Sequence, residues 1–122
     1  MRPVIHSQVV EIPHEMTTTA FEIPGYRITA NKGVVRGVVV RSRSVFGTIG
    51  AGLQTIFGGN ISLFTELAER TRQQAFDTML IQAHLADAHA VIGIRYDATE
   101  LMHGVTEVLC YGTAVTLERS TG

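Results

Sequence analysis

Residues 61–90, ISLFTELAERTRQQAFDTMLIQAHLADAHA, form the stretch that decides the fold. Apolar and small side chains recur in it every three or four residues, which places them on one face of an α-helix. This face comprises Leu63, Leu67, Thr71, Ala75, Met79, Gln82, Ala83 and Ala86, and Phe64, Ala68, Phe76 and Leu80 widen it. No glycine or proline interrupts the stretch. We predict a helix of about 25 residues, roughly 37 Å long, against which the rest of the chain must pack.

The composition is that of a single folded domain. The chain has 122 residues, of which 45% are hydrophobic and 17% charged, and this balance excludes a disordered protein. A net charge of −1 gives no reason to expect binding to nucleic acid. No run approaches the roughly 18 apolar residues that span a bilayer, and the first residues lack the apolar core of a secretory signal. We therefore expect a cytoplasmic protein that has no membrane partner.

The N-terminal quarter holds an extension, a strand and a turn. Residues 1–15 show no clear period and are predicted to extend from a single domain at residues 16–122. Residues 17–21 are β-branched and aromatic, which predicts a short strand. Pro24-Gly25 predicts a turn, because proline fixes φ and glycine allows the positive φ of a type II turn.

Residues 26–41, YRITANKGVVRGVVVR, are predicted to form one long strand or two short ones. In the second case Asn31-Lys32-Gly33 would be the hairpin turn. Gly37 indicates either a bulge or a close approach of another backbone. The three valines at residues 38–40 are apolar on both faces of the strand, which favours burial on both sides. One helix covers only one face of a sheet, so the second face would need a partner subunit.

Residues 42–60 carry five glycines among apolar side chains that are too hydrophobic for a solvated loop. We expect them to be buried, either in this subunit or in a neighbour. With the two outer valines of the preceding strand, they give the predicted oligomer interface: Val38, Val40, Phe46, Ile49, Leu53, Ile56 and Phe57.

Two strands are predicted after the helix. Residues 90–97 form the first, with Ile92, Ile94 and Tyr96 on one face, and residues 99–104 are expected to be a loop. Residues 105–118 form the second strand. One of its faces is small (Val108, Cys110, Gly112 and Ala114), which suits close packing against a helix. Strands on both sides of one long helix give an α+β domain with a mainly antiparallel sheet.

Four segments together resemble the YbjQ-like family of small bacterial proteins, often labelled a "putative heavy-metal-binding" domain. They are VVRGVVVRSRSVFGTIGAGLQTIFGG at residues 34–59, TELAERTRQQAFDTM at 65–79, ADAHAVIGIRYDAT at 86–99 and EVLCYGTAVTLE at 107–118. The resemblance implies a β-α-β-β core of the dodecin-subunit type that assembles as a homopentameric ring, and it implies no known reaction. The family's turn after the helix usually reads Gly-Ala-Asn, whereas this chain has Asp87-Ala88-His89, and Asp87 is less suited than glycine to positive φ.

The metal label directs attention to the possible ligands. A site for a divalent heavy metal ion could form between subunits from His103, Glu107 and Cys110, which lie near one strand. Cys110 is the single cysteine, however, and structural zinc sites use four closely arranged Cys or His ligands. We therefore favour the alternative that the histidines are ordinary surface or turn residues.

Three arginines indicate a second kind of site. Arg36, Arg41 and Arg43 precede the glycine-rich segment, and their guanidinium groups suit a phosphate or carboxylate. The glycine spacing matches neither a Walker nor a dinucleotide fingerprint. The favoured alternative is that the glycines permit tight packing between subunits and the arginines form salt bridges there.

No arrangement of residues predicts catalysis. The serines lack a nucleophile-elbow context, and Cys110 lies in a strand that is predicted to be packed, where thiols are usually inert. We therefore predict a non-enzymatic, ring-forming homo-oligomer whose only clear partner is itself. The alternative is a binding protein for a heavy metal ion or a small anion at subunit boundaries.

Overall fold

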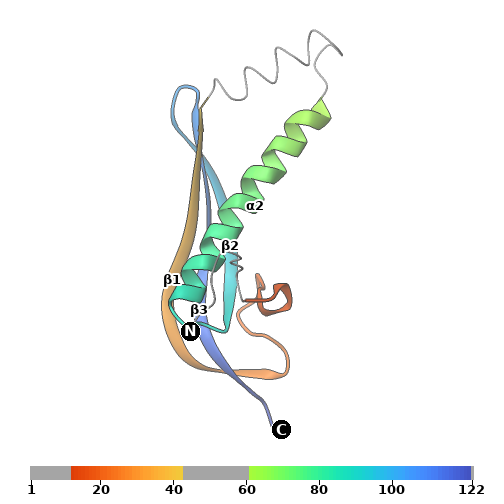
Figure 1. The fold of residues 1–122 in the computed structure, drawn as a ribbon, viewed down its shortest axis with the longest axis vertical. Coiled ribbons are helices and arrows are strands. Elements are labelled where there is room, and N and C mark those ends of the chain that lie inside the picture. Colours follow the sequence, from red (N-terminus) through yellow and green to blue (C-terminus); the bar gives the residue numbers. More distant parts are fainter. Residues whose placement is uncertain (1–11, 43–60, 122) are drawn as a thin grey trace.

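The computed structural model describes residues 12–42 and 61–121. Its elements are the 3₁₀-helix η1 (His14–Met16), the strand β1 (Tyr26–Ser42), the helix α2 (Ile61–Leu85) and the strands β2 (Ala90–Met102) and β3 (Val105–Arg119). The strands pair antiparallel in the order β1-β3-β2, and α2 crosses one face of the sheet (Figure 1). The predicted α+β class and β-α-β-β order are confirmed. Several predicted site residues lie outside the described residues: Arg43 of the anion site, and Phe46, Ile49, Leu53, Ile56 and Phe57 of the oligomer interface.

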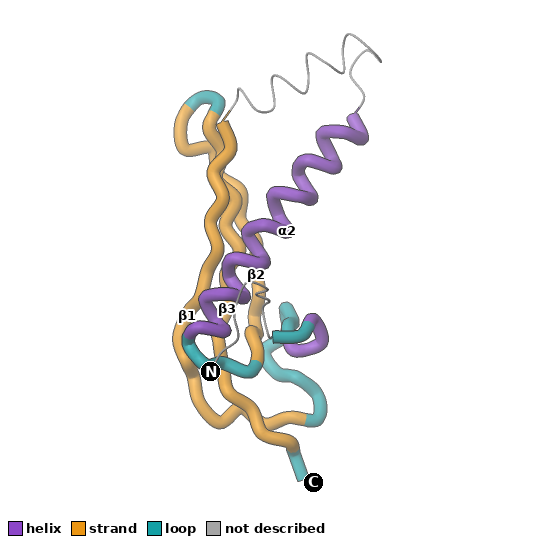
Figure 2. The backbone as a smooth tube through the Cα atoms, viewed as in Figure 1, coloured by secondary structure: helices purple, strands orange, loops and turns teal. Residues whose placement is uncertain are grey.

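The helix is the one that the sequence predicts, with the same 25-residue length. Ala75, Met79 and Ala83 on its predicted apolar face are fully buried against the sheet. Its first turns lean away from the strands, whereas its C-terminal half lies close to them (Figure 2). No helix in the described ranges combines the length and apolar character needed to cross a bilayer.

Residues 26–41 belong to one long strand, and the alternative of two short strands joined by a hairpin turn is wrong. β1 runs unbroken through Asn31-Lys32-Gly33, and the expected turn appears only as an irregularity in the register with β3. The side-chain oxygen of Asn31 accepts the backbone N–H of Gly33 at 2.7 Å, which satisfies an amide displaced by the irregularity. The predicted Pro24-Gly25 turn is confirmed: the N–H of Tyr26 donates to the carbonyl of Ile23, and Gly25 has a φ of 88°.

Gly37 provides the close approach between β1 and α2. A Cβ atom built on it would lie 2.0 Å from the carbonyl oxygen of Ala75 and 2.7 Å from the backbone nitrogen of Met79. The neighbouring Val35 and Val39 are also buried, whereas Val38 and Val40 point to the other face and are 44% and 50% exposed. Among the residues that the structure describes, therefore, only one face of this strand is covered.

The helix ends in a Schellman motif, in which the residue after the helix adopts a left-handed conformation. Asp87 has a φ of 63°, and its N–H donates to the carbonyl of His84. The N–H of Ala88 then donates to the carbonyl of Ala83 at 3.1 Å. Asp87-Ala88-His89 thus form the turn after the helix, and Asp87 adopts there the positive φ to which glycine is better suited.

Two predictions about β2 are wrong. The expected loop at residues 99–104 is the end of a hairpin: β2 continues to Met102, and the turn consists of His103 and Gly104. Ile92 does not share a face with Ile94 and Tyr96, because the register with β3 shifts between Ile92 and Arg95. Gly93 lies in this shift with a φ of 62°, and the extra residue turns the strand over.

The segment before β1 pairs with β2, the edge strand on the side of the sheet away from β1. Thr17 forms a single parallel bridge with Val91, and the N–H of Gly93 donates to the carbonyl of Ala20 at 2.7 Å. The strand predicted at residues 17–21 is thus reduced to one bridge with flanking hydrogen bonds. Ile12 also packs into the core, at 5% exposure.

Candidate functional site

Three cross-strand rows form the part of the sheet face under α2 that lies between the centre of the sheet and the hairpin. Residues directly opposite each other in neighbouring strands point to the same side of a sheet, so the register defines which side chains meet. From the centre of the sheet toward the hairpin, the rows are Gly37–Cys110–Tyr96, Val39–Val108–Ala98 and Arg41–Thr106–Glu100. The middle row is apolar and the outer row is polar, so the character of the surface changes under the first half of α2.

A pocket of about 180 Å³ lies over the two outer rows. Its lining is formed by Arg41, Ala68, Thr71, Arg72, Ala98, Thr106 and Val108. Arg41 comes from the end of β1 and Arg72 from α2, so side chains from distant parts of the sequence line one cavity. The Arg41 side chain is oriented by a hydrogen bond of 2.6 Å from Nη2 to the side-chain oxygen of Gln74.

The innermost row holds the single thiol. Cys110 is fully buried, and its sulfur lies 3.7 Å from the sulfur of Met79 on α2. Burial raises the pKa of the Cys110 thiol, and desolvation together with this neighbour raises the pKa of Tyr96 to about 12. Both groups therefore stay protonated at neutral pH, and a buried protonated thiol is a poor nucleophile and a poor metal ligand.

The residues of the predicted metal site are spread over the hairpin. His103 lies in the turn, Glu107 points to the face opposite α2, and Cys110 points under the helix. Within the described ranges no three His, Cys, Asp or Glu side chains gather closely enough to hold a metal ion. A site shared between two copies of the chain stays a prediction.

The arginines of the predicted anion site are also separated. Arg36 points to the same face as Val38, whereas Arg41 points to the helix side. The residue that does share a pocket with Arg41 is Arg72, which the helical pattern places among the solvated side chains. The sequence gives one indication that Arg72 lies near the sheet: it is four residues from Ala68 on the helix and directly follows Thr71, which belongs to the predicted buried face.

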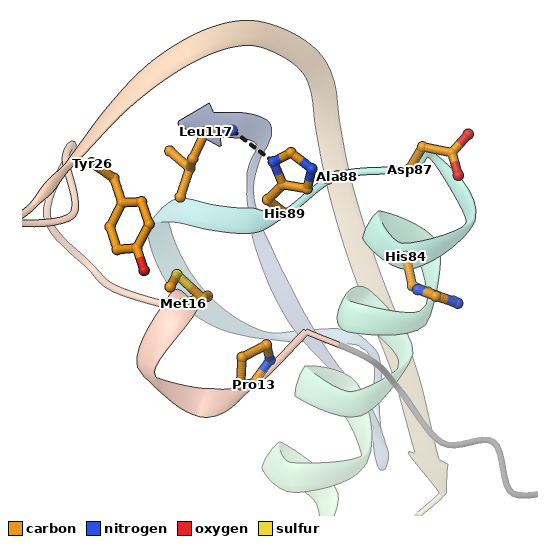
Figure 3. A pocket seen from close by; sticks show the side chains of 8 residues that line it. All are labelled: Pro13, Met16, Tyr26, His84, Asp87, Ala88, His89 and Leu117. Atoms are coloured by element: carbon orange, nitrogen blue, oxygen red, sulfur yellow. Dashed lines mark hydrogen bonds between the residues drawn. The ribbon is translucent and has the colours of Figure 1, made fainter. Parts of the chain in front are cut away.

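A larger groove of about 600 Å³ lies at the other end of the helix (Figure 3). It is lined by Pro13, Met16, Tyr26, His84, Asp87, Ala88, His89 and Leu117. His89 connects the helix turn to β3: its N–H donates to the carbonyl of Val115, and its ring Nδ1 accepts the N–H of Leu117 at 2.8 Å. The ring of His89 thus supplies the acceptor for a backbone amide of β3.

We expect His89→Ala to lower the free energy of unfolding by about 1–2 kcal/mol, because the N–H of Leu117 loses its acceptor. His89→Asn is the matched control, since its side-chain oxygen can accept the same amide, and it should stay within about 0.5 kcal/mol of the wild type. Urea denaturation followed by circular dichroism measures both. Equal stability of the alanine and asparagine variants would contradict the assigned role.

Comparison with known proteins places the chain in a family. Residues 15–118 match the YbjQ family, described as "putative heavy-metal-binding". A UPF0145 protein of Solibacter usitatus is 64% identical over 104 residues, which cover 85% of this chain and 93% of that protein. A UPF0145 protein of Paraburkholderia phymatum is 62% identical over 89% of this chain and 98% of its own length.

A solved structure is also similar. It is the crystal structure of a protein of unknown function from the DUF74 family of Pediococcus pentosaceus, 20% identical, with a TM-score of 0.48. The match covers 84% of this chain and 96% of that one. The names of the two UPF0145 relatives describe no enzyme. On the match over residues 15–118 and the identity to the UPF0145 proteins, the chain belongs to the YbjQ family.

Proposed function

We propose that this protein is a non-enzymatic subunit of a homo-oligomer, a homopentameric ring with a dodecin-like subunit core, and that the assembly is the functional unit. The observation that carries the proposal is the sheet face opposite α2, which we call the open face. It consists of Val34, Arg36, Val38 and Val40 of β1, Glu107, Leu109, Tyr111 and Thr113 of β3, and Arg95, Asp97 and Thr99 of β2.

The open face is apolar at its centre. Val38 lies opposite Leu109 and next to Val40 on this face, and Val34 lies beyond Arg36; Val34 and Val40 are at least half exposed. Burying one valine side chain contributes about 1.5 kcal/mol or more, so this face gains substantially from a cover. Contiguous exposed apolar residues on a small protein are typical of a surface that contacts another protein.

A five-fold ring needs two different patches on each subunit, because its interfaces join head to tail. α2 supplies a second patch on the side away from the sheet, where Ile81 and Leu85 are exposed and four residues apart. We propose that α2 of one subunit packs on the open face of the next. Each sheet in the ring would then be covered by helices on both faces.

Native mass spectrometry of the untagged protein tests the assembly, and we expect the mass of five subunits. Val38→Lys combined with Val40→Lys should give monomers, because two ammonium groups cannot be buried unpaired in an apolar interface. Leu85→Lys tests the second patch in the same way. Met102→Lys, at the exposed end of the hairpin, is the matched control and should keep the ring. A monomeric wild type, or an intact ring in the double variant, would overturn the proposal.

The second candidate function is a binding protein for a heavy metal ion or a small anion, and the family description supports the metal form. His103 and Glu107 of neighbouring subunits would hold the ion, and Cys110, which is buried under α2, would join them only if the helix moved off the sheet. Equilibrium dialysis of metal-stripped protein against zinc, copper and cadmium tests it. Stoichiometric binding that is lost in His103→Ala and Cys110→Ala would support a site, whereas binding unchanged by both substitutions would exclude these ligands.

A further inference from the structure

We propose that charge decides how α2 of one subunit lies on the open face of the next. Asp77 of the helix faces Arg36 of the neighbouring sheet, and Arg70 of the helix lies between Asp97 and Glu107. The inference rests on the proposed function and adds to it the direction of the helix and the side chains that fix this direction. The partner is a second copy of this chain, because both charged surfaces belong to it.

The open face carries opposite charges at its two ends. Arg36 and Arg95 flank Tyr111 in one cross-strand row. Toward the hairpin, the next row holds Asp97 and the row after it holds Glu107. The face is therefore positive at the Tyr111 row and negative near the hairpin, and a partner surface with the reverse order of charges would match it.

Arg36, Asp97 and Glu107 are available for a partner. Within the described part of the chain, their side chains make no hydrogen bond or ion pair. Arg95, by contrast, donates to the carbonyl of Thr19 at 3.0 Å. Arg36 is therefore the arginine of its row that can pair with a neighbouring subunit.

The outward side of α2 carries the complementary charges. Asp77 lies two residues before fully buried Met79, about 200° around the helix, so it points away from the sheet. Arg70 is nearly two turns earlier and is exposed on the same side. Among the described residues, the carboxylate of Asp77 accepts a hydrogen bond from the neutral side chain of Gln73 at 2.9 Å, and no ion pair neutralises it.

The symmetry of a five-fold ring fixes the direction of the helix. In its own subunit α2 runs antiparallel to β1, because Gly37 packs against Met79, whereas Arg41, further along β1, bonds to Gln74, earlier in α2. A five-fold rotation turns any direction by at most about 72°, so α2 of the neighbouring subunit cannot run in the opposite sense. Its N-terminal half therefore lies toward the hairpin of the sheet that it covers, where the open face is negative.

The spacing of the charges agrees with this direction. Arg70 and Asp77 are about 10.5 Å apart along the helix axis. At roughly 3.4 Å per residue, the Asp97 row is about 6.8 Å from the Arg36 row, and the Glu107 row is about 13.6 Å from it. When Asp77 lies over Arg36, Arg70 therefore reaches both carboxylates. The opposite direction would place Arg70 on the far side of Arg36, away from both.

Charge reversal tests the pairing, with dissociation of rings of the full-length protein followed by sedimentation velocity over a range of protein concentrations. Asp77→Arg and Arg36→Asp should each raise the concentration at which half of the rings dissociate by about tenfold or more, because like charges then meet at every interface. The double variant restores opposite charges and should return to within about threefold of the wild type. Arg70→Glu and Glu107→Arg should each weaken the ring too, and should recover only in part when combined, because Asp97 stays negative.

Glu22→Arg is the matched control. It changes the net charge as Asp77→Arg does, but Glu22 is exposed in the segment before β1, outside both surfaces, so its ring should dissociate like that of the wild type. Failure of the pairing differs from failure of the ring. If Val38→Lys with Val40→Lys breaks the ring, but Arg36→Asp with Asp77→Arg is no more stable than either single variant, the assembly stands and the pairing is overturned. A monomeric wild type overturns both.

Discussion

Replacement of Gly37 by alanine is expected to destabilise the protein by about 3 kcal/mol or more, because the new methyl group has no space. Its position lies 2.0 Å from the carbonyl oxygen of Ala75 and 2.7 Å from the backbone nitrogen of Met79. Overpacking a core typically costs about 1–3 kcal/mol when side chains can adjust. Here the neighbours are backbone atoms of α2, so the whole helix must move away from β1. Urea denaturation measures the loss.

Gly33→Ala is the matched control in the same strand. A Cβ atom at this position meets nothing within 4 Å, but Gly33 has a φ of 103°, which an alanine adopts only with strain. We expect a cost of about 1–2 kcal/mol from the backbone alone. If Gly37→Ala cost no more than Gly33→Ala, the close packing of α2 on β1 would be wrong.

The contrast between the two glycines shows what could be predicted from the sequence. The helix follows from a pattern that its own residues carry, and its length and the burial of Thr71, Ala75, Met79 and Ala83 are confirmed. For Gly37 the sequence left a bulge and a close approach open, because the choice depends on where α2 crosses β1. The hairpin at Met102 was missed because its turn, His103-Gly104, lacks the usual Asn-Gly pair and its strand ends are exposed.

The candidate site was predicted less completely, because it too depends on how distant segments come together in the fold. Arginines close in sequence alternate between two faces of a strand, so Arg36 and Arg41 separate as soon as β1 forms. Arg41 and Arg72 line one pocket because α2 crosses over the sheet, a tertiary arrangement that neither segment encodes alone. By contrast, burial of Cys110 was predictable, since the alternating small residues of β3 define a helix-facing side.

The packing of Cys110 leads to the second large expected effect, at Met79. This side chain is fully buried at the centre of the core, among residues of α2, β1 and β3, and its sulfur touches the thiol. Met79→Ala removes three heavy atoms from a close-packed interior and leaves a cavity. We expect a loss of about 2–5 kcal/mol in the free energy of unfolding, measured by urea denaturation.

Met102→Ala is the control that separates this effect from the general consequence of losing a methionine. Met102 is 64% exposed at the end of the hairpin, so its replacement should change stability by less than about 0.5 kcal/mol. The cavity in Met79→Ala should also expose the Cys110 sulfur, so this thiol should react with Ellman's reagent faster in the variant than in the wild type. Equal stability of the two variants, together with an unchanged thiol reaction rate, would mean that α2 does not pack on the sheet through Met79.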